Sequence, residues 1–276
     1  MSPLLIRHAR GVTLTAEGQQ FYEHCRRILA EIDHAAESVR SQTSVPSGRI
    51  FVGLPTSACR GLSLPLLESV SQRLPNVTLH LVEAMSGYLD DLIQVGRLDV
   101  ALLYDHKAFE HVAWTEMMTE QLMMFVTVDN PLAKKKSISF KKLFAQDLIT
   151  LPGRPNVLRV VIEQLAARHD VKVNVNDCDS LPAIAKLVCN SNHVTVMPQF
   201  AFIDEIKRGE MAPILIVNPT PVWTLAVVVS QRTVNARASE AVARTMADLM
   251  AEMVKQGTWR AELRGDRRHL EPKTRT

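Results

Sequence analysis

The chain has 276 residues, of which 46% are hydrophobic and 22% charged, and its formal net charge is +3. These values are typical of a globular protein with one large domain or two ordinary ones, and they exclude collagen-like and disulfide-scaffold proteins. Basic residues exceed acidic ones by four from Lys255 onward, so the rest of the chain has a formal net charge of −1. This nearly neutral charge argues against a non-specific nucleic-acid binder.

The four cysteines are scattered and include no C-x-x-C pair, which argues against a zinc knuckle or a thiol redox motif. Such cysteines are typical of reduced thiols in a cytosolic protein. The first ten residues lack the apolar core of a signal peptide, and no run of about 18 apolar residues predicts a membrane span. The sequence therefore predicts a cytoplasmic protein with no membrane contact.

Two short apolar segments, residues 4–6 and 12–14, flank a turn that contains Gly11. This pattern predicts a β-hairpin. Because an isolated two-stranded hairpin is only marginally stable in water, we expect the hairpin to pack against further structure, as it would within a small domain.

A long amphipathic helix is predicted after the hairpin. Thr15 is suited to cap it, and Glu17 lies in its first turn, where the helix dipole favours a carboxylate. Apolar or small residues then recur in steps of four and three, as in a coiled-coil seam, at Phe21, Cys25, Ile28, Ile32, Ala35 and Val39. A helix of roughly 25 residues with one narrow stripe favours dimerisation, and the alternative is packing on the chain's own domain. The five stripe residues other than Cys25 are the predicted dimerisation residues.

Residues 41–48 are polar, contain Pro46 and Gly48, and predict a hinge. Strands and helices alternate beyond it. Strands are predicted at residues 50–54, 77–82 and 99–104, and helices at residues 62–74 and 89–95. The last strand is continuously apolar, which is typical of a strand buried on both faces. This βαβαβ order predicts a parallel sheet with right-handed crossovers.

A second α/β unit is predicted between two polar links, one near Thr119 and one near Asn218. Its predicted strands are residues 122–128, 147–151, 171–175 and 194–197, and its helices are residues 157–167 and 181–189. After the second link come a buried strand at 223–229 and an amphipathic helix at 236–255. Two such units predict two lobes with a ligand cleft between them. The basic, aperiodic residues 256–276 predict a disordered tail.

Six segments, in this order and spacing, are similar to those of a known family: Leu4–Arg7, Arg10–Gly18, Ser47–Gly53, Gly96–Tyr104, Asn130–Ala133 and Asp179-Ser180. Together they resemble the LysR-type bacterial transcriptional regulators. Within that family, Arg10-Gly11-Val12, Ser86-Gly87 and Tyr104-Asp105-His106 are most similar to the nitrogen-assimilation-control branch.

The resemblance implies an α/β fold with a two-lobed effector domain like the type II periplasmic binding proteins. It implies the remnant of a winged helix-turn-helix at 1–15, a linker and dimerisation helix at 16–43, lobe I at 49–118 plus 219–255, and lobe II at 119–218. Family members begin with a helix-turn-helix of roughly 60 residues whose second helix enters the major groove. Most of that element is absent from this sequence. A mis-called start codon is the favoured explanation, and a fragment or a natural short form are the alternatives.

The resemblance also implies binding residues. In the wing, Arg7 and Arg10 would contact the DNA backbone. The effector would be held by lobe I residues Thr56, Ser57 and Ser86, and by lobe II residues Thr150, Arg154, Met197 and Pro198. Hydroxyls and backbone N–H groups at the start of a helix suit a small anion such as a carboxylate. The alternatives are that the Ser and Thr residues only cap helices, that Arg154 is a surface charge, and that the cleft is vestigial.

Catalytic motifs are absent from the sequence: it has no Gly-x-Ser-x-Gly elbow, no Walker loop and no Gly-x-Gly-x-x-Gly. His106, Glu110 and His111 come closest to a metal site but lack an evident further ligand. We therefore expect a protein that is not an enzyme and needs no cofactor.

The predicted function is DNA-binding transcription regulation by a homodimer or homotetramer that responds to a small effector, with DNA bound by the full-length form. The alternative is a ligand-binding and oligomerisation module without DNA binding, which would act on full-length partners as a dominant negative.

Overall fold

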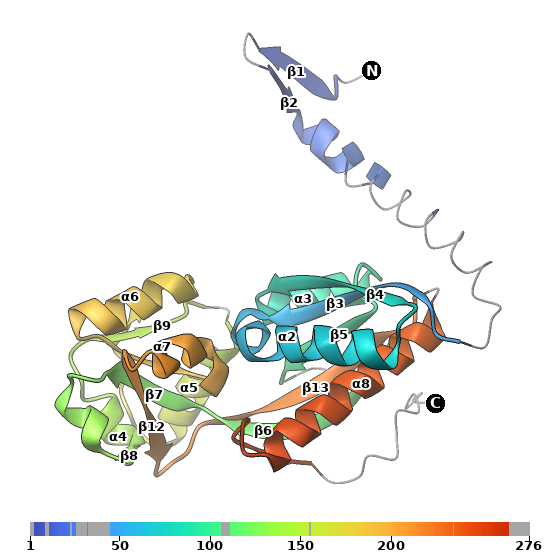
Figure 1. Ribbon diagram of the computed structural model, residues 1–276. Helices are drawn as coiled ribbons and strands as arrows, with labels where there is room; N and C mark the ends of the chain where they lie inside the picture. The colour runs from blue at the N-terminus through green and yellow to red at the C-terminus, as the bar shows by residue number, and fades with distance from the viewer. Residues whose placement is uncertain are drawn as a thin grey trace.

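The computed structural model describes residues 3–8, 11–22, 24–25, 32, 45–105, 111–154, 156–233 and 235–264. Most of these residues form two α/β lobes that lie side by side, and the N-terminal hairpin and the helix after it lie apart from both lobes (Figure 1). Each lobe is built on a six-stranded sheet. None of the helices in the described part of the chain is long and apolar enough to cross a membrane.

The N-terminal segment confirms the predicted hairpin. Strand β1 (Leu5–His8) pairs antiparallel with β2 (Gly11–Leu14), and residues 16–22 are helical. The backbone N–H of Gly18 donates to Thr15 Oγ1 at 2.9 Å, so Thr15 caps the helix as predicted. A Cβ atom on Gly18 would lie 1.9 Å from the carbonyl oxygen of Leu4, so the hairpin approaches the helix too closely for any other residue.

The predicted dimerisation stripe is described in part. Phe21 and Ile32 are 54% and 58% exposed, whereas Ile28, Ala35 and Val39 lie outside the described residues. Arg10 and the side chain of Arg7 also lie outside them. Dimerisation through this stripe and DNA contact by the two arginines therefore stay predictions.

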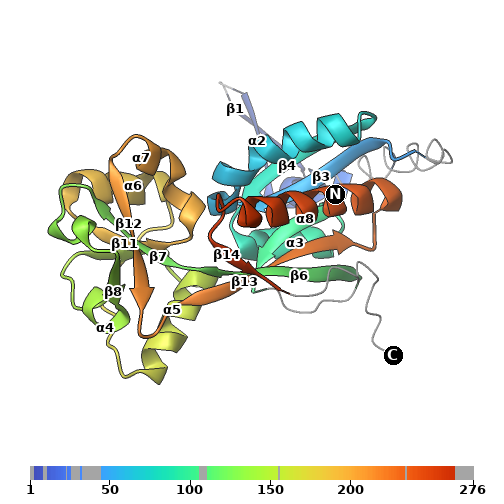
Figure 2. The same cartoon turned by 60° about the horizontal axis from the view of Figure 1, so that its bottom comes forward.

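Lobe I has the strand order β14-β6-β13-β5-β3-β4. Its strands are β3 (Gly48–Pro55), β4 (Val77–Ala84), β5 (Val100–Tyr104), β6 (Val112–Gln121), β13 (Val222–Ser230) and β14 (Ala261–Leu263). Helices α2 (Thr56–Arg73) and α8 (Ala236–Lys255) cover one face, and α3 (Ser86–Gln94) covers the other (Figure 2). Strand β5 is buried on both faces as predicted, because Leu102 packs in the α2 and α8 cluster while Leu103 packs in the α3 cluster.

Lobe II has the strand order β10-β9-β11-β7-β12-β8. Its strands are β7 (Met123–Thr127), β8 (Ser137–Ser139), β9 (Ile149–Leu151), β10 (Asn176–Asp177), β11 (Val194–Met197) and β12 (Met211–Val217). Its longer helices are α5 (Val157–Arg168) and α6 (Leu181–Ser191). The shorter ones are η1 (Pro131–Lys134), α4 (Phe140–Leu143), η2 (Gln199–Phe202) and α7 (Ile203–Lys207). The chain passes between the lobes from β6 to β7 and returns from β12 to β13.

The parallel arrangement predicted from the βαβαβ order is confirmed for strands β3, β4 and β5, but both sheets also contain antiparallel strands. Strand β13 runs antiparallel to β5 and β6, and β7 runs antiparallel to β11 and β12. The physical reason is the double crossing between the lobes, because β7 and β13, the strands by which the chain enters each lobe from the other, run opposite to their neighbours in the sheet. The predicted strand at 171–175 was wrong, since these residues form no strand and pairing is confined to the two residues of β10 that follow them.

The start of the predicted disordered tail is likewise corrected. Residues 261–263 form β14, which pairs antiparallel with β6, and Trp259 is 1% exposed. The basic composition of the tail masked this strand, although Trp259, Ala261 and Leu263 alternate with polar residues, as in a half-buried strand. Residues 265–276 lie outside the described residues.

Candidate functional site: the cleft between the lobes

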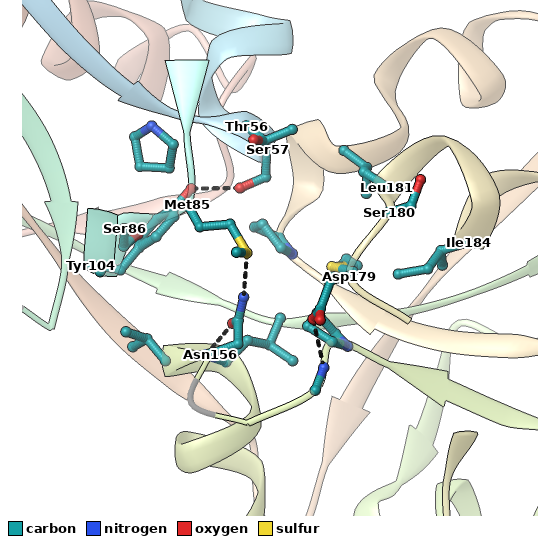
Figure 3. Close-up of a pocket in the computed structure, with 18 of the residues that line it drawn as sticks. Thr56, Ser57, Met85, Ser86, Tyr104, Asn156, Asp179, Ser180, Leu181 and Ile184 are labelled. Carbon is teal, nitrogen blue, oxygen red and sulfur yellow. Dashed lines mark hydrogen bonds between the residues drawn. The ribbon is translucent and has the colours of Figure 1, made fainter. Parts of the chain in front are cut away.

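A cleft of about 470 Å³ lies between the two lobes at the carboxyl ends of strands β3, β4, β5, β9 and β11 (Figure 3). This volume suits a small organic molecule. Its walls come from segments that are far apart in the chain: Pro55–Ser57, Met85–Tyr88, Tyr104, Pro152–Arg154, Asn156–Leu158, Asp179–Pro182, Ile184, Met197-Pro198 and Trp223.

The lobe I wall is formed by two helix N-termini that no side chain caps. Thr56 and Ser57 begin α2, and Ser86 begins α3. The N-cap residues Pro55 and Met85 make no side-chain capping hydrogen bond. The first turn of a helix carries N–H groups without intrahelical partners. These two termini therefore offer backbone donors to a ligand, with the positive end of each helix dipole behind them.

The floor of the cleft is an aromatic pair. The rings of Tyr104 and Trp223 are stacked, with centroids 3.8 Å apart and planes inclined by 14°. The hydroxyl of Tyr104 lies 3.0 Å from Ser57 Oγ, which ties the floor to the start of α2. Burial, together with the charge of Glu120, raises the pKa of Tyr104 well above its ordinary value. The tyrosine hydroxyl is therefore kept protonated and remains a donor for Ser57 or a ligand.

Glu120 lies beneath this floor and is 1% exposed. Its Oε2 accepts a hydrogen bond from Trp223 Nε1 at 2.8 Å, and its Oε1 accepts one from Trp259 Nε1 at 2.9 Å. Burial raises the pKa of Glu120 to about 7, although the two indoles and the backbone N–H of Gln199 favour the carboxylate. A buried acid is costly unless its oxygens are bonded, and here both are. The carboxyl fixes the orientation of Trp223 in the cleft.

The lobe II wall differs because its helices are capped by their own side chains. Asn156 Oδ1 accepts from the N–H of Leu158 at 3.0 Å, and Ser180 Oγ accepts from the N–H of Ala183. Asn156 also reaches across the cleft, where its Nδ2 lies 3.9 Å from the sulfur of Met85 (Figure 3). This weak contact joins the two walls directly.

Six of the seven predicted effector residues line the cleft: Thr56, Ser57, Ser86, Arg154, Met197 and Pro198. The placement of Thr150 there was wrong. It is fully buried within the lobe II sheet, and its hydroxyl lies 2.8 Å from His193 Nδ1. Position at a strand end does not decide which face a side chain occupies, because successive side chains in a strand alternate between faces.

The cleft offers little unpaired positive charge. Among its described lining residues, the charged side chains are Arg154 and Asp179. Arg154 is 72% exposed and pairs with Glu163, and Asp179 accepts a hydrogen bond from the backbone N–H of Gly153 at 2.9 Å. An anionic ligand group would thus depend on the backbone donors of lobe I. The rest of the wall is apolar or carries neutral hydroxyl and amide groups.

Sequence reasoning missed Tyr104, Trp223 and Glu120 as parts of this site. Tyr104 could have been found, since it ends a buried strand at the edge where ligands bind. Nothing in the sequence around Glu120 indicated a buried acid, because it lies in the polar segment near Thr119 that was predicted to link the two lobes. For the metal hypothesis, the described residues contain no group of three potential ligands, and His106 and Glu110 lie outside them.

Comparison with known proteins identifies the family. The LysR substrate binding domain matches residues 43–251. The nitrogen assimilation regulatory protein nac of Klebsiella aerogenes is 28% identical over 200 residues, which are 72% of this chain and 64% of that protein. The protein of the same name from Escherichia coli K12 matches to the same extent. The matched region thus spans just under two thirds of these relatives, and it supports the similarity to the nitrogen-control branch.

Solved structures confirm the fold. A hydrogen-peroxide-bound OxyR mutant of Corynebacterium glutamicum superposes with a TM-score of 0.68 at 21% identity, over 93% of this chain and 81% of that one. A full-length OxyR mutant from Pseudomonas aeruginosa gives 0.66 at 20% identity, over 88% and 84%. The predicted two-lobed fold and the predicted family are both confirmed. The chain belongs to the LysR family of transcriptional regulators, and residues 43–251 are its substrate-binding domain.

Proposed function

We propose that this protein is a transcription regulator whose two-lobed domain binds a small effector in the cleft between the lobes. The observation that carries the proposal is the construction of the cleft: two uncapped helix N-termini face an aromatic floor made by Tyr104 and Trp223. The effector class that fits is a small molecule with a flat apolar body and one acceptor group, such as a carboxylate. Its acceptor group would be held by Ser57 and the first turn of α2.

The ligand class is tested with two simple probes, benzoate and benzamide, by isothermal titration calorimetry. Both present a flat ring and a carbonyl acceptor, and they differ in charge. We expect saturable binding of benzoate, and weaker binding of benzamide because the helix dipoles favour the anion. Ser57→Ala removes a hydroxyl from the cleft and should weaken binding about fivefold, as expected for one hydrogen bond. Ser71→Ala, on an exposed position of the same helix, is the matched control.

Three outcomes contradict parts of this assignment. If neither probe binds, the proposed ligand class is wrong. If benzoate binds with equal affinity to the wild type and to Ser57→Ala, it occupies another site. Equal affinity for benzoate and benzamide would show that the uncapped termini do not select for charge.

Regulation by this protein would require oligomerisation and DNA contact. The exposed stripe residues Phe21 and Ile32 fit a helix that pairs with a second copy, because a solvent-exposed apolar seam is stabilised by a partner helix. Light scattering on the wild type should give a dimer or tetramer, and Phe21→Glu with Ile32→Glu should shift it toward monomer. Gln20→Glu, an exposed change off the seam, should leave the mass unchanged. A monomeric wild type would contradict this part of the proposal.

DNA contact is proposed for Arg7 and Arg10 in the wing. This step belongs to the full-length form, in which a recognition helix would read the bases. A form of the protein that oligomerises and binds benzoate but shows no salt-dependent binding to duplex DNA would favour the ligand-sensing module instead.

A further inference from the structure

The segment that follows α8 lies outside the residues that the family model matches, yet it is built into the structure. We call residues 257–264 the C-terminal strap. The chain turns at Gly257, where φ is +73°, and the N–H groups of Thr258 and Trp259 both donate to the carbonyl of Met253. Strand β14 then extends the lobe I sheet beside β6, with Ala261 opposite Glu120. The strap is thus fastened to lobe I at both of its ends.

The same strap is also bonded to lobe II. Gln199 is the first residue of η2, directly after the cleft residues Met197 and Pro198. Its Nε2 donates to the carbonyl of Thr258 at 3.2 Å, and its Oε1 accepts from the N–H of Arg260 at 2.8 Å. One side chain of lobe II therefore pairs with the strap backbone on both sides of the buried Trp259.

Beside these hydrogen bonds, an aromatic ring of lobe II enters lobe I. Phe200 is buried, and its ring centroid lies 4.7 Å from that of Trp259. On its other side it faces Gly61 of α2, where a Cβ atom would lie 2.4 Å from the phenyl ring. The absence of a side chain at Gly61 makes the socket into which Phe200 fits, and the strap closes that socket.

Polar contacts from the residue before Gly61 in α2 support the socket. Arg60 of lobe I donates to the carbonyl of Ala201 at 2.9 Å and to Glu205 Oε2 at 2.9 Å. The carboxyl of Glu120 completes the connection, because it accepts from Trp259 in the strap and from Trp223 in the cleft floor. The strap, the interlobe socket and the cleft floor are joined through a chain of direct contacts.

We propose that the C-terminal strap is a clamp that fixes the angle between the lobes and, through Glu120, holds Trp223 in place in the cleft. Its release loosens the contact between Phe200 and Gly61 and lowers the affinity of the cleft. The second statement rests on the proposed function of the cleft, whereas the first stands without any ligand.

The clamp is tested in the full chain with two substitutions. Gln199→Ala removes both side-chain hydrogen bonds to the strap and leaves the buried rings in place. Trp259→Phe keeps an aromatic ring against Phe200 and removes the N–H group that donates a hydrogen bond to Glu120. Gln256→Ala is the matched control, because this exposed amide precedes the strap and donates to Glu252 of its own helix.

Hydrogen exchange without ligand is read by mass spectrometry in three segments: the strap at 258–264, η2 at 199–202 and the socket at 56–61. Both variants should exchange at least about tenfold faster in all three segments. The reason is that Gln199→Ala loses two hydrogen bonds to the strap, and Trp259→Phe loses the buried hydrogen bond to Glu120. Gln256→Ala should behave as the wild type. Faster exchange confined to 258–264 would show that the strap is only an edge strand and would overturn the proposal. Unchanged exchange in all three segments would overturn it as well.

The ligand part is read from benzoate binding. Trp259→Phe should raise the dissociation constant for benzoate at least about fivefold, because Trp223 is no longer held against a fixed carboxyl. An unchanged dissociation constant, with faster exchange in all three segments, would overturn the link to the cleft and retain the clamp. If the wild type does not bind benzoate, the proposed ligand class fails while the exchange experiment still decides the clamp.

Discussion

The stability of this fold should depend on pH through Glu120, whose carboxyl is buried among Trp223, Trp259, the backbone of Gln199 and Tyr104. Burial raises its pKa from 4.5 to about 7 in the folded protein. The folded state therefore prefers the protonated acid more strongly than the unfolded state does. Stability is greatest below about pH 4.5 as far as this group is concerned, and it falls as the pH rises through about 7.

The size of this effect follows from the two pKa values. Each unit of pKa difference between folded and unfolded states corresponds to about 1.4 kcal/mol, so ionisation of Glu120 should lower the free energy of unfolding by about 3 kcal/mol by pH 8. Glu120→Gln cannot ionise. The difference in unfolding free energy between wild type and Glu120→Gln should therefore move by about 2 to 3 kcal/mol in favour of the variant between pH 5 and pH 8, since a small part of the effect is already present at pH 5.

Urea denaturation followed by circular dichroism at several pH values measures this difference. Glu116→Gln serves as the control, since Glu116 is on the same strand but is exposed and pairs with Arg264. Its difference from the wild type should stay within about 1 kcal/mol across the range, as for a surface ion pair. A difference between wild type and Glu120→Gln that does not change with pH would refute the reasoning, because it would mean that Glu120 ionises as it does in water.

Two further predictions concern packing and buried hydrogen bonds. Gly61→Ala should destabilise the fold by about 1–3 kcal/mol, because the new methyl group would overlap the ring of Phe200, and urea denaturation should show it. Gly87→Ala is its control and should be neutral or slightly stabilising, since nothing lies within 4 Å of the added Cβ. Asp99→Asn should cost about 1–3 kcal/mol of unfolding free energy, because the buried carboxylate accepts from the N–H of Phe51 and from the hydroxyl of Thr233 and an amide cannot accept both. A loss below about 0.5 kcal/mol in either case would mean that the neighbouring groups rearrange at little cost.

The elements that were predicted correctly are those whose local sequence pattern is compatible with only one stable secondary structure. Residues 100–104 are continuously apolar, and such a strand is stable only when both of its faces are covered. Thr15 followed three residues later by Gly18 allows both a cap and a close approach of the hairpin, and the structure uses both. Four of the six family segments lie within the two lobes, at the starts of strands β3 and β5 and of helices η1 and α6.

The cleft was predicted in outline and corrected in detail. Ser57 and Ser86, which the family resemblance implied as binding residues, do line the cleft, and both follow parallel strands at whose carboxyl ends ligands are expected. The same expectation failed for Thr150, whose face within the strand depends on the register of its neighbours. Side chains that reach the cleft from a crossing strand, such as Trp223, have no place in a rule about single βαβ units.

What the sequence determined by itself was the set of local elements and the family, because hydrophobic periodicity, caps and short ordered motifs depend on residues near one another in the chain. Only the tertiary structure decided that Glu120, Trp223 and Trp259 meet, and that a segment read as a tail closes the socket of Phe200. The physical reason is that the buried carboxyl and the two indoles form their hydrogen bonds only after the fold has brought them together in the protein interior. Residues 120 and 259 are separated by 139 positions, and no local pattern records a contact over that distance.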